Sequence, residues 1–258
     1  MTANQPLSSA APDGLAARLA GLGLPAAGTQ GRQDALPGSL RAFHRALLGV
    51  FLIGAGPPDL TVAGRLAAEL ELDPQAALAA LAAADLVHAD PAAGRVRVAY
   101  PFSGTPTAHR VELTDSPPVY AICALDALGI PQMARRDGRI RSEDPISGQP
   151  ITIQVDQHGW RWQPTTTVVL VGAATRGDAC GSVAEGCCPF INFHASLADT
   201  AAYRRAQPAM AVELLAQAEA VAAAGRIFGG LLNSEPSRDP AESPSTPAAA
   251  TNDLRHLR

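Results

Sequence analysis

Large apolar side chains are spaced regularly only in the middle of this chain, and that spacing limits the part that can fold. The two ends are instead rich in Ala, Pro, Gly, Ser and Thr. Segments of that composition bury too little apolar surface to offset the conformational entropy that folding removes. We therefore predict a disordered leader over residues 1–38 and a disordered tail over residues 234–258.

The first folded segment, residues 39–100, has the pattern of three helices followed by a hairpin. Phe43, Leu47 and Phe51 recur at helical spacing. We expect helices over residues 41–53, 61–72 and 75–84, the second capped by Thr61 and the third starting at Asp73-Pro74, and strands over residues 87–89 and 95–100. This order is typical of a winged helix-turn-helix unit.

The charge of this winged-helix-like unit disfavours a DNA-binding role. Its second and third predicted helices carry Arg65 against the acidic residues Glu69, Glu71, Asp73 and Asp85. A recognition helix needs basic side chains for phosphates and base edges. The net charge of −4 also argues against nucleic-acid and anionic membrane partners. We predict a structural role for the unit, in capping or dimerisation.

The remaining residues, 101–233, predict a second domain that mixes β-sheet and helix, which makes the chain an α+β protein. Pro117-Pro118 favours a helix that starts after it, so we expect a buried helix over Val119–Leu128, closed by Gly129 and Pro131. We also expect strands over residues 110–113, 151–155 and 166–171, and closing helices over residues 198–207 and 208–224.

Three of the four cysteines fall in two short apolar segments of this second domain. Cys187 and Cys188 are adjacent, and their spacings to Cys123 and Cys180 do not fit a zinc knuckle built from Cys-x-x-Cys pairs. Thiolates in this number suit a soft, thiophilic ion in linear or trigonal geometry. A Cys187–Cys188 disulfide that acts as a redox switch is an alternative.

Asp126 adds a proton carrier to the first of these segments. It lies three residues after Cys123, so on a helix both side chains share one face. The carboxylate can accept the thiol proton and, once protonated and buried, can donate that proton to a leaving group. The alternative is that Cys123 is a small buried hydrophobe and Asp126 a satisfied polar residue.

The segment Tyr120-Ala-Ile-Cys-Ala-Leu-Asp-Ala-Leu128 resembles the Tyr-Ala-x-Cys-Ala-Leu/Ile-Asp-x-Leu segment of the organomercurial (alkylmercury) lyases. In that family it carries the first catalytic cysteine and the catalytic aspartate. Cys188, followed by Phe193 and Ala195-Ser196, resembles the second catalytic stretch, in which a cysteine leads into Phe-Phe-Ala-Ser. The resemblance extends from about Leu40 to about Phe228. It implies that Cys123, Asp126 and Cys188 are catalytic.

The chain departs from the family pattern at several positions. Cys187 is an extra thiol beside Cys188; it is the rival for the catalytic assignment and a further candidate mercury ligand. His194 replaces the second Phe, and Asp144 falls near a family cysteine thought to be structural. Cys180 has no counterpart in the pattern. These changes leave the three catalytic positions intact and bear on substrate range.

The resemblance implies cleavage of carbon–mercury bonds by protonolysis, with organomercurial small molecules as substrates and no cofactor besides the mercury of substrate and product. It also implies that Hg(II) leaves to cytosolic thiols or to a mercuric reductase. The sequence contains no run of about 18 apolar residues, the length needed to span a bilayer. Its start also lacks a secretory signal, so we expect a cytoplasmic protein. A non-catalytic thiolate metal-binding protein and a metal-responsive regulator are the alternatives.

Overall fold

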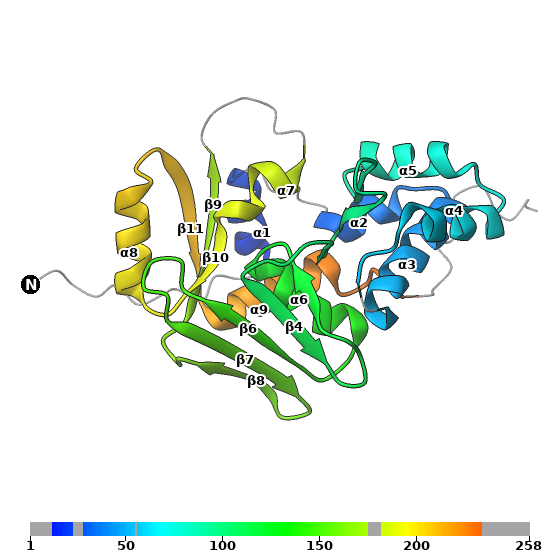
Figure 1. Ribbon diagram of the computed structural model, residues 1–258. Helices are drawn as coiled ribbons and strands as arrows, with labels where there is room; N and C mark the ends of the chain where they lie inside the picture. The colour runs from blue at the N-terminus through cyan, green and yellow to red at the C-terminus, as the bar shows by residue number, and fades with distance from the viewer. Residues whose placement is uncertain (1–11, 23–27, 55, 175–181, 234–258) are drawn as a thin grey trace, which may run out of the picture.

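The computed structural model describes residues 12–22, 28–54, 56–174 and 182–233. Helices pack around two antiparallel sheets (Figure 1), which confirms the α+β class. The helices are α1 (Pro12–Gly21), α2 (Gly28–Asp34), α3 (Gly38–Ile53), α4 (Leu60–Glu69), α5 (Pro74–Ala83), α6 (Ala124–Ala134), α7 (Val183–Gly186), α8 (Leu197–Ala206) and α9 (Gln217–Phe228), with a 3₁₀ turn, η1, at Cys188–Phe190. No helix in this described part is both long and apolar enough to cross a bilayer.

The larger sheet has eight strands in the order β1-β2-β3-β5-β4-β6-β7-β8. Their bounds are β1 Val87–Asp90, β2 Arg95–Ala99, β3 Phe102–Ser103, β4 His109–Leu113, β5 Val119–Ala121, β6 Gly138–Glu143, β7 Pro150–Asp156 and β8 Gly159–Gln163. The smaller sheet has the order β10-β9-β11, with β9 Val168–Ala174, β10 Ile191–His194 and β11 Met210–Leu215. Because β2 pairs with β3, the front hairpin and the second domain share one sheet.

The three front helices and the hairpin occur where the sequence predicts them. Phe43, Leu47 and Phe51 are buried on one face of α3, as the apolar spacing of an amphipathic helix requires. Asp73 caps α5, and Pro74 occupies its first turn. The predicted cap of the second helix is wrong, because Asp59 and not Thr61 accepts the Val62 N–H, at 2.7 Å.

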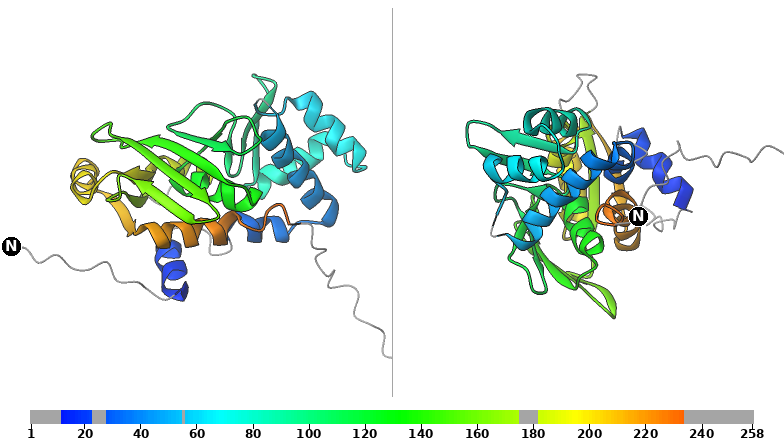
Figure 2. Two further views of the ribbon diagram at one scale, coloured as in Figure 1. Left: turned by 90° about the horizontal axis from the view of Figure 1, so that it is seen from below. Right: turned by 90° about the vertical axis from the view of Figure 1, so that its right-hand side faces the viewer.

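The predicted disordered leader is also wrong for the part that the structure describes, because α1 and α2 form there. Arg18 of α1 is paired with Glu213 and Glu219, each at 3.0 Å, and Leu15 and Leu19 are buried. The left view of Figure 2 shows α1 beneath α9. Leu15, Leu19 and Leu22 stand at helical spacing, a local signal that the prediction overlooked, and the long-range ion pairs of Arg18 add to their packing. The predicted tail, 234–258, lies outside the described residues.

The helix predicted over Val119–Leu128 is instead a strand followed by a helix. β5 lies between β3 and β4 and pairs with both, so its first residues are held by the sheet. The helix α6 begins only after Cys123 and continues past Gly129 and Pro131 to Ala134. Gly129 is a packing residue and not a stop, because a Cβ there would lie 2.3 Å from the Phe228 ring.

A second correction concerns the predicted helix over 208–224. Its first part is strand β11, which pairs with β9 along its whole length, and α9 begins at Gln217.

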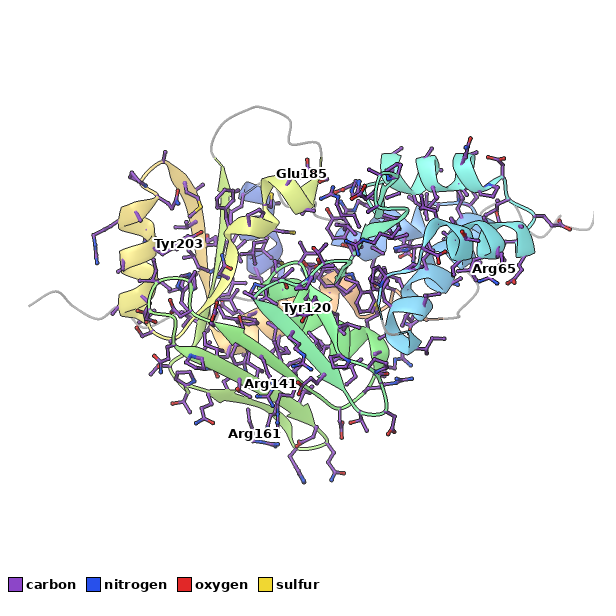
Figure 3. The ribbon with its side chains drawn as sticks, in the orientation of Figure 1. Arg65, Tyr120, Arg141, Arg161, Glu185 and Tyr203 are labelled. Carbon is purple, nitrogen blue, oxygen red and sulfur yellow. The ribbon has the colours of Figure 1, made fainter. Side chains whose placement is uncertain are left out.

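The side chains of the larger sheet divide between its two faces, as expected for half-buried strands. Arg141 and Arg161 extend from the outer face in Figure 3, while Ile140 and Ile153 are buried beneath the sheet. Helix α6 contacts β4, β5 and β10 and packs along α9.

Candidate active site

The amino end of α6 brings Cys123 and Asp126 together. Cys123 is the N-cap residue, with extended backbone angles of φ −144° and ψ 179°, and Asp126 is in the first helical turn. The Asp126 carboxyl lies within 4.8 Å of the Cys123 Sγ, and the backbone N–H and thiol of Cys123 both favour its ionised form. The predicted proximity therefore holds, although it comes from a helix start and not from a shared face within a helix. Both side chains are almost fully buried.

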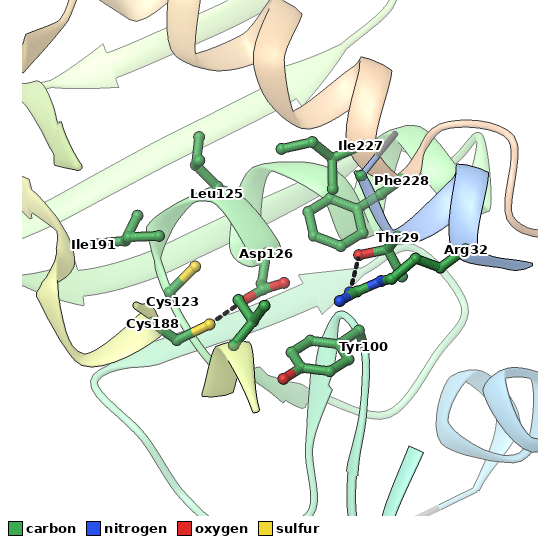
Figure 4. A pocket seen from close by; sticks show the side chains of 12 residues that line it. Thr29, Arg32, Tyr100, Cys123, Leu125, Asp126, Cys188, Ile191, Ile227 and Phe228 are labelled. Carbon is green, nitrogen blue, oxygen red and sulfur yellow. Dashed lines mark hydrogen bonds between the residues drawn. The ribbon is translucent and has the colours of Figure 1, made fainter. Parts of the chain in front are cut away.

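Cys188 approaches the same carboxylate from another part of the chain. It follows α7 and begins η1, just before β10. Its Sγ donates to Asp126 Oδ2 at 3.8 Å, as Figure 4 shows. The ligand atoms of Cys123, Asp126 and Cys188 lie within 4.8 Å of one another, and all three residues are buried. We refer to this cluster as the Cys–Asp–Cys triad.

Burial changes the acidity of Asp126. It raises the pKa of this carboxyl from 3.8 to about 7, against the opposing effect of the hydrogen bonds from Cys123 and Cys188 and the distant charge of Arg32. The amino end of a helix would by itself favour the carboxylate, so removal from water dominates. Near neutral pH this group can therefore both accept and donate a proton, as the sequence interpretation requires.

The two thiols are also less acidic than usual. Burial raises the pKa of Cys123 well above its ordinary value, and its contacts with Cys188 and Asp126 add to the effect. The hydrogen bond with Cys123 lowers the pKa of Cys188, but burial and the nearby Asp126 carboxylate outweigh it, so this pKa is raised as well. A thiophilic ion that binds here would displace these protons, because a metal-bound thiol is deprotonated.

The triad lines a cavity of about 40 Å³, room for roughly three water-sized groups. Its walls are mostly apolar, from Leu125, Val183, Ile191, Ile227 and Phe228. Three polar residues from distant segments, Thr29, Arg32 and Tyr100, complete the lining (Figure 4). The sequence interpretation missed Thr29 and Arg32 because it assigned their segment to a disordered leader. Residues 28–34 contain no large apolar side chain whose spacing could have indicated α2.

The other predicted positions are placed differently. Cys187 is half-buried and outside the group of donor atoms, so the structure does not bring this predicted ligand into the triad. Cys188 is a free thiol, so the alternative of a Cys187–Cys188 disulfide is not realised. Cys180 lies outside the described residues. Asp144 is buried in a turn, where its carboxylate accepts from the N–H groups of Ile146, Ser147 and Ala195.

We predict that Asp126 makes the stability of the protein fall as pH rises. Its pKa is near 3.8 in the unfolded chain and about 7 in the folded one, so the folded state holds the extra proton between these values. The resulting contribution to the free energy of unfolding is at most about 4 kcal/mol. It is complete below the unfolded pKa and is lost as pH rises through about 7. Urea unfolding of wild type and Asp126→Asn at pH 5 and pH 8 measures it: the variant should be the more stable at pH 8. A less stable variant at pH 8 would contradict the sign.

Comparison with known proteins agrees with this geometry. Residues 102–229 match the family described as alkylmercury lyase. The fold is similar to a crystal structure of the mercury-bound form of MerB2, with a TM-score of 0.62 and 17% identity over 79% of this chain and 96% of that chain. No match was found among the curated proteins. The resemblance predicted from the two cysteine segments is confirmed: residues 102–229 of this chain match the alkylmercury lyase family.

Proposed function

We propose that this protein cleaves the carbon–mercury bond of organomercurials by protonolysis, so that R–Hg–X gives R–H and Hg(II). The observation that carries the proposal is the Cys–Asp–Cys triad, in which two thiols and a carboxyl with a pKa of about 7 lie together in a buried, mostly apolar cavity. A carbon–mercury bond resists water because the departing carbanion is a very strong base. Its cleavage therefore needs electron donation to mercury and an acid held at the carbon.

The first steps load mercury onto the thiols. Cys123 displaces X from R–Hg–X and its proton leaves with X as HX. The Asp126 carboxylate then takes the proton of Cys188, which donates to it in the resting site. The Cys188 thiolate adds to mercury, which now carries R and two sulfur ligands. Two thiolates increase the electron density on the metal and weaken its bond to carbon.

The last step returns the proton. Protonated Asp126 delivers it to the carbon, the electron pair of the carbon–mercury bond becomes the new carbon–hydrogen bond, and R–H leaves. Mercury stays Hg(II) on Cys123 and Cys188, and Asp126 is again a carboxylate. Two external thiols regenerate the site by exchange, each returning one proton to a cysteine. No electron is gained or lost, so the cycle needs no redox cofactor.

Turnover in the presence of thiol tests the proposal. The cavity has room for methyl more readily than for phenyl, so methylmercury is the first substrate and phenylmercury the second. We expect the protein to release methane and benzene catalytically when it is incubated anaerobically with each compound and excess thiol. Headspace gas chromatography measures both products. Tight mercury binding without any hydrocarbon would instead favour a non-catalytic metal-binding protein of the same family.

A further inference from the structure

The short helix α7 leads directly into Cys188, and its amino end lacks a cap of its own. A helix leaves its first backbone N–H groups without partners inside the helix. Ser182 occupies the N-cap position, but its side chain makes no capping bond, and its buried Oγ has no hydrogen-bond partner among the described residues. We call residues Ser182 to Cys188 the Cys188 arm.

Two residues from the front of the chain supply the missing cap. The Val183 N–H donates to Asp85 Oδ2 at 3.2 Å, and the Ala184 N–H donates to the Tyr100 hydroxyl at 2.6 Å. The Tyr100 hydroxyl in turn donates to Asp85 Oδ1 at 3.2 Å. One connected group thus holds both of the first two N–H groups of α7. Its members are 84 and 98 residues away in sequence from the groups they bind.

Asp85 is itself fixed from two further directions. Arg32 Nη1 donates to Asp85 Oδ2 at 2.6 Å, and His88 Nε2 lies 2.7 Å from Asp85 Oδ1. Burial raises the pKa of Asp85, but the His88 hydrogen bond and the Arg32 charge outweigh burial and leave it lowered, so Asp85 remains a carboxylate. The guanidinium of Arg32 also stacks on the Tyr100 ring, 5.4 Å from its centroid.

The backbone of Asp85 has a left-handed conformation, which aspartate and asparagine adopt more readily than most other non-glycine residues. Its φ is 51°, in the left-handed region, directly after the C-cap of α5. Glycine is the usual residue there, with asparagine next. Glu71 has the same left-handed conformation directly after the C-cap of α4, with φ 57°, so the backbone angle alone assigns no role. The contacts of the Asp85 side chain with Val183, Tyr100 and Arg32 are what place its role at α7.

We propose that Asp85 and Tyr100 are positioning residues that hold Cys188 against Asp126. The proposal rests on the proposed function. It gives the winged-helix-like unit, residues 39–100, the role of capping the Cys188 arm. The Cys188 Sγ to Asp126 Oδ2 contact is already long, at 3.8 Å, so a small displacement of the arm breaks it. Neither Asp85 nor Tyr100 transfers a proton or binds mercury in this account.

Tyr100→Phe and Asp85→Asn test the proposal. Tyr100→Phe removes one hydroxyl and keeps the ring under Arg32; Asp85→Asn removes the charge while asparagine tolerates the backbone angle. Loss of a helix cap should lower kcat about 5- to 30-fold with little change in KM, because the arm matters for the cleavage step. Amide hydrogen exchange over residues 183–188 should become faster in both variants.

Asp73→Asn is the matched control. Asp73 caps α5 through the Ala76 N–H at 2.8 Å, so Asp73→Asn makes the same chemical change as Asp85→Asn at a helix cap that does not touch α7. This variant should leave exchange in the arm and turnover as in wild type. A global loss of stability in the test variants would speed exchange throughout the protein and would overturn a specific effect on the arm.

The readouts separate this proposal from the proposed function. Unchanged exchange over residues 183–188 in both test variants would overturn the positioning role, whatever the turnover. Faster exchange with unaltered kcat would overturn the link between the arm and Cys188. If wild type releases no hydrocarbon, the proposed function fails. The positioning role is then tested by the affinity for Hg(II) in competition with a free thiol. Weaker Hg(II) binding in both variants supports positioning, and unchanged binding overturns it.

Discussion

Asp126→Asn is expected to capture an organomercurial but to release hydrocarbon about 10²- to 10⁴-fold more slowly than wild type. Asparagine has the size of aspartate, so both thiols stay in place to bind mercury. The amide can neither take the Cys188 proton nor deliver one to carbon. Because the carboxyl is buried and protonated up to about pH 7, its neutral replacement should also be tolerated by the fold.

The measurement compares capture and release in one preparation. Mass spectrometry of the intact protein after brief exposure to methylmercury reports capture, and methane in the headspace reports release. Asp156→Asn serves as the control, since Asp156 is paired with Arg161 at 2.6 Å on the outer part of the larger sheet. Near-normal methane release by Asp126→Asn would mean that another acid supplies the proton. Equal loss of capture would mean that Asp126 mainly activates the thiols.

The pairing of Cys123 with Asp126 was predictable even though the local structure was not. The predicted helix ran through Cys123, whereas the real one begins after it. A spacing of three residues brings the side chains together in both cases, because an N-cap residue and the third residue of the helix also meet. The predicted proximity of the two side chains depended on this spacing, so it holds although the predicted start of the helix was wrong.

The strand β5 could not be found from local sequence because its partners are distant. Val119 pairs with Val111 and Tyr120 with Ser103, and neither pairing leaves a periodic pattern in three residues. The same holds for β11, whose apolar residues fit a strand or a helix until β9 is placed beside them. Short strands such as β5 and β11 are specified by the strands that surround them.

The residues of one cavity wall were also not predicted from the sequence, for a different reason. Arg32 lies in a segment with little apolar spacing, and its docking depends on Asp85 at 2.6 Å and on the Tyr100 ring. Ion pairs and stacking between distant segments have no signature in composition. The sequence thus indicated the three residues of the Cys–Asp–Cys triad, while the residues that enclose and support them emerged only from tertiary structure.

Cys188→Ser is expected to reduce hydrocarbon release to the rate measured without protein, whereas Cys187→Ser should retain most of it. The serine hydroxyl at position 188 can still donate to Asp126 and fill the site, but it is too hard and too weakly acidic to ligate mercury. Cys188 lines the cavity and contacts Asp126 at 3.8 Å. Cys187 is half-buried and lies outside the triad.

The adjacent pair makes this a matched comparison, because both variants make the same chemical change one residue apart. Circular dichroism should show that each variant is folded, and intact mass after methylmercury exposure should show that Cys188→Ser still acquires mercury on Cys123. Loss of release in Cys187→Ser with activity kept in Cys188→Ser would shift the catalytic assignment by one residue.

Activity in both variants would mean that the two thiols are interchangeable. That requires the backbone after α7 to rotate either sulfur toward Asp126. The contacts that Asp85 and Tyr100 make with the first turn of α7 oppose that rotation, so the structure favours one thiol, Cys188.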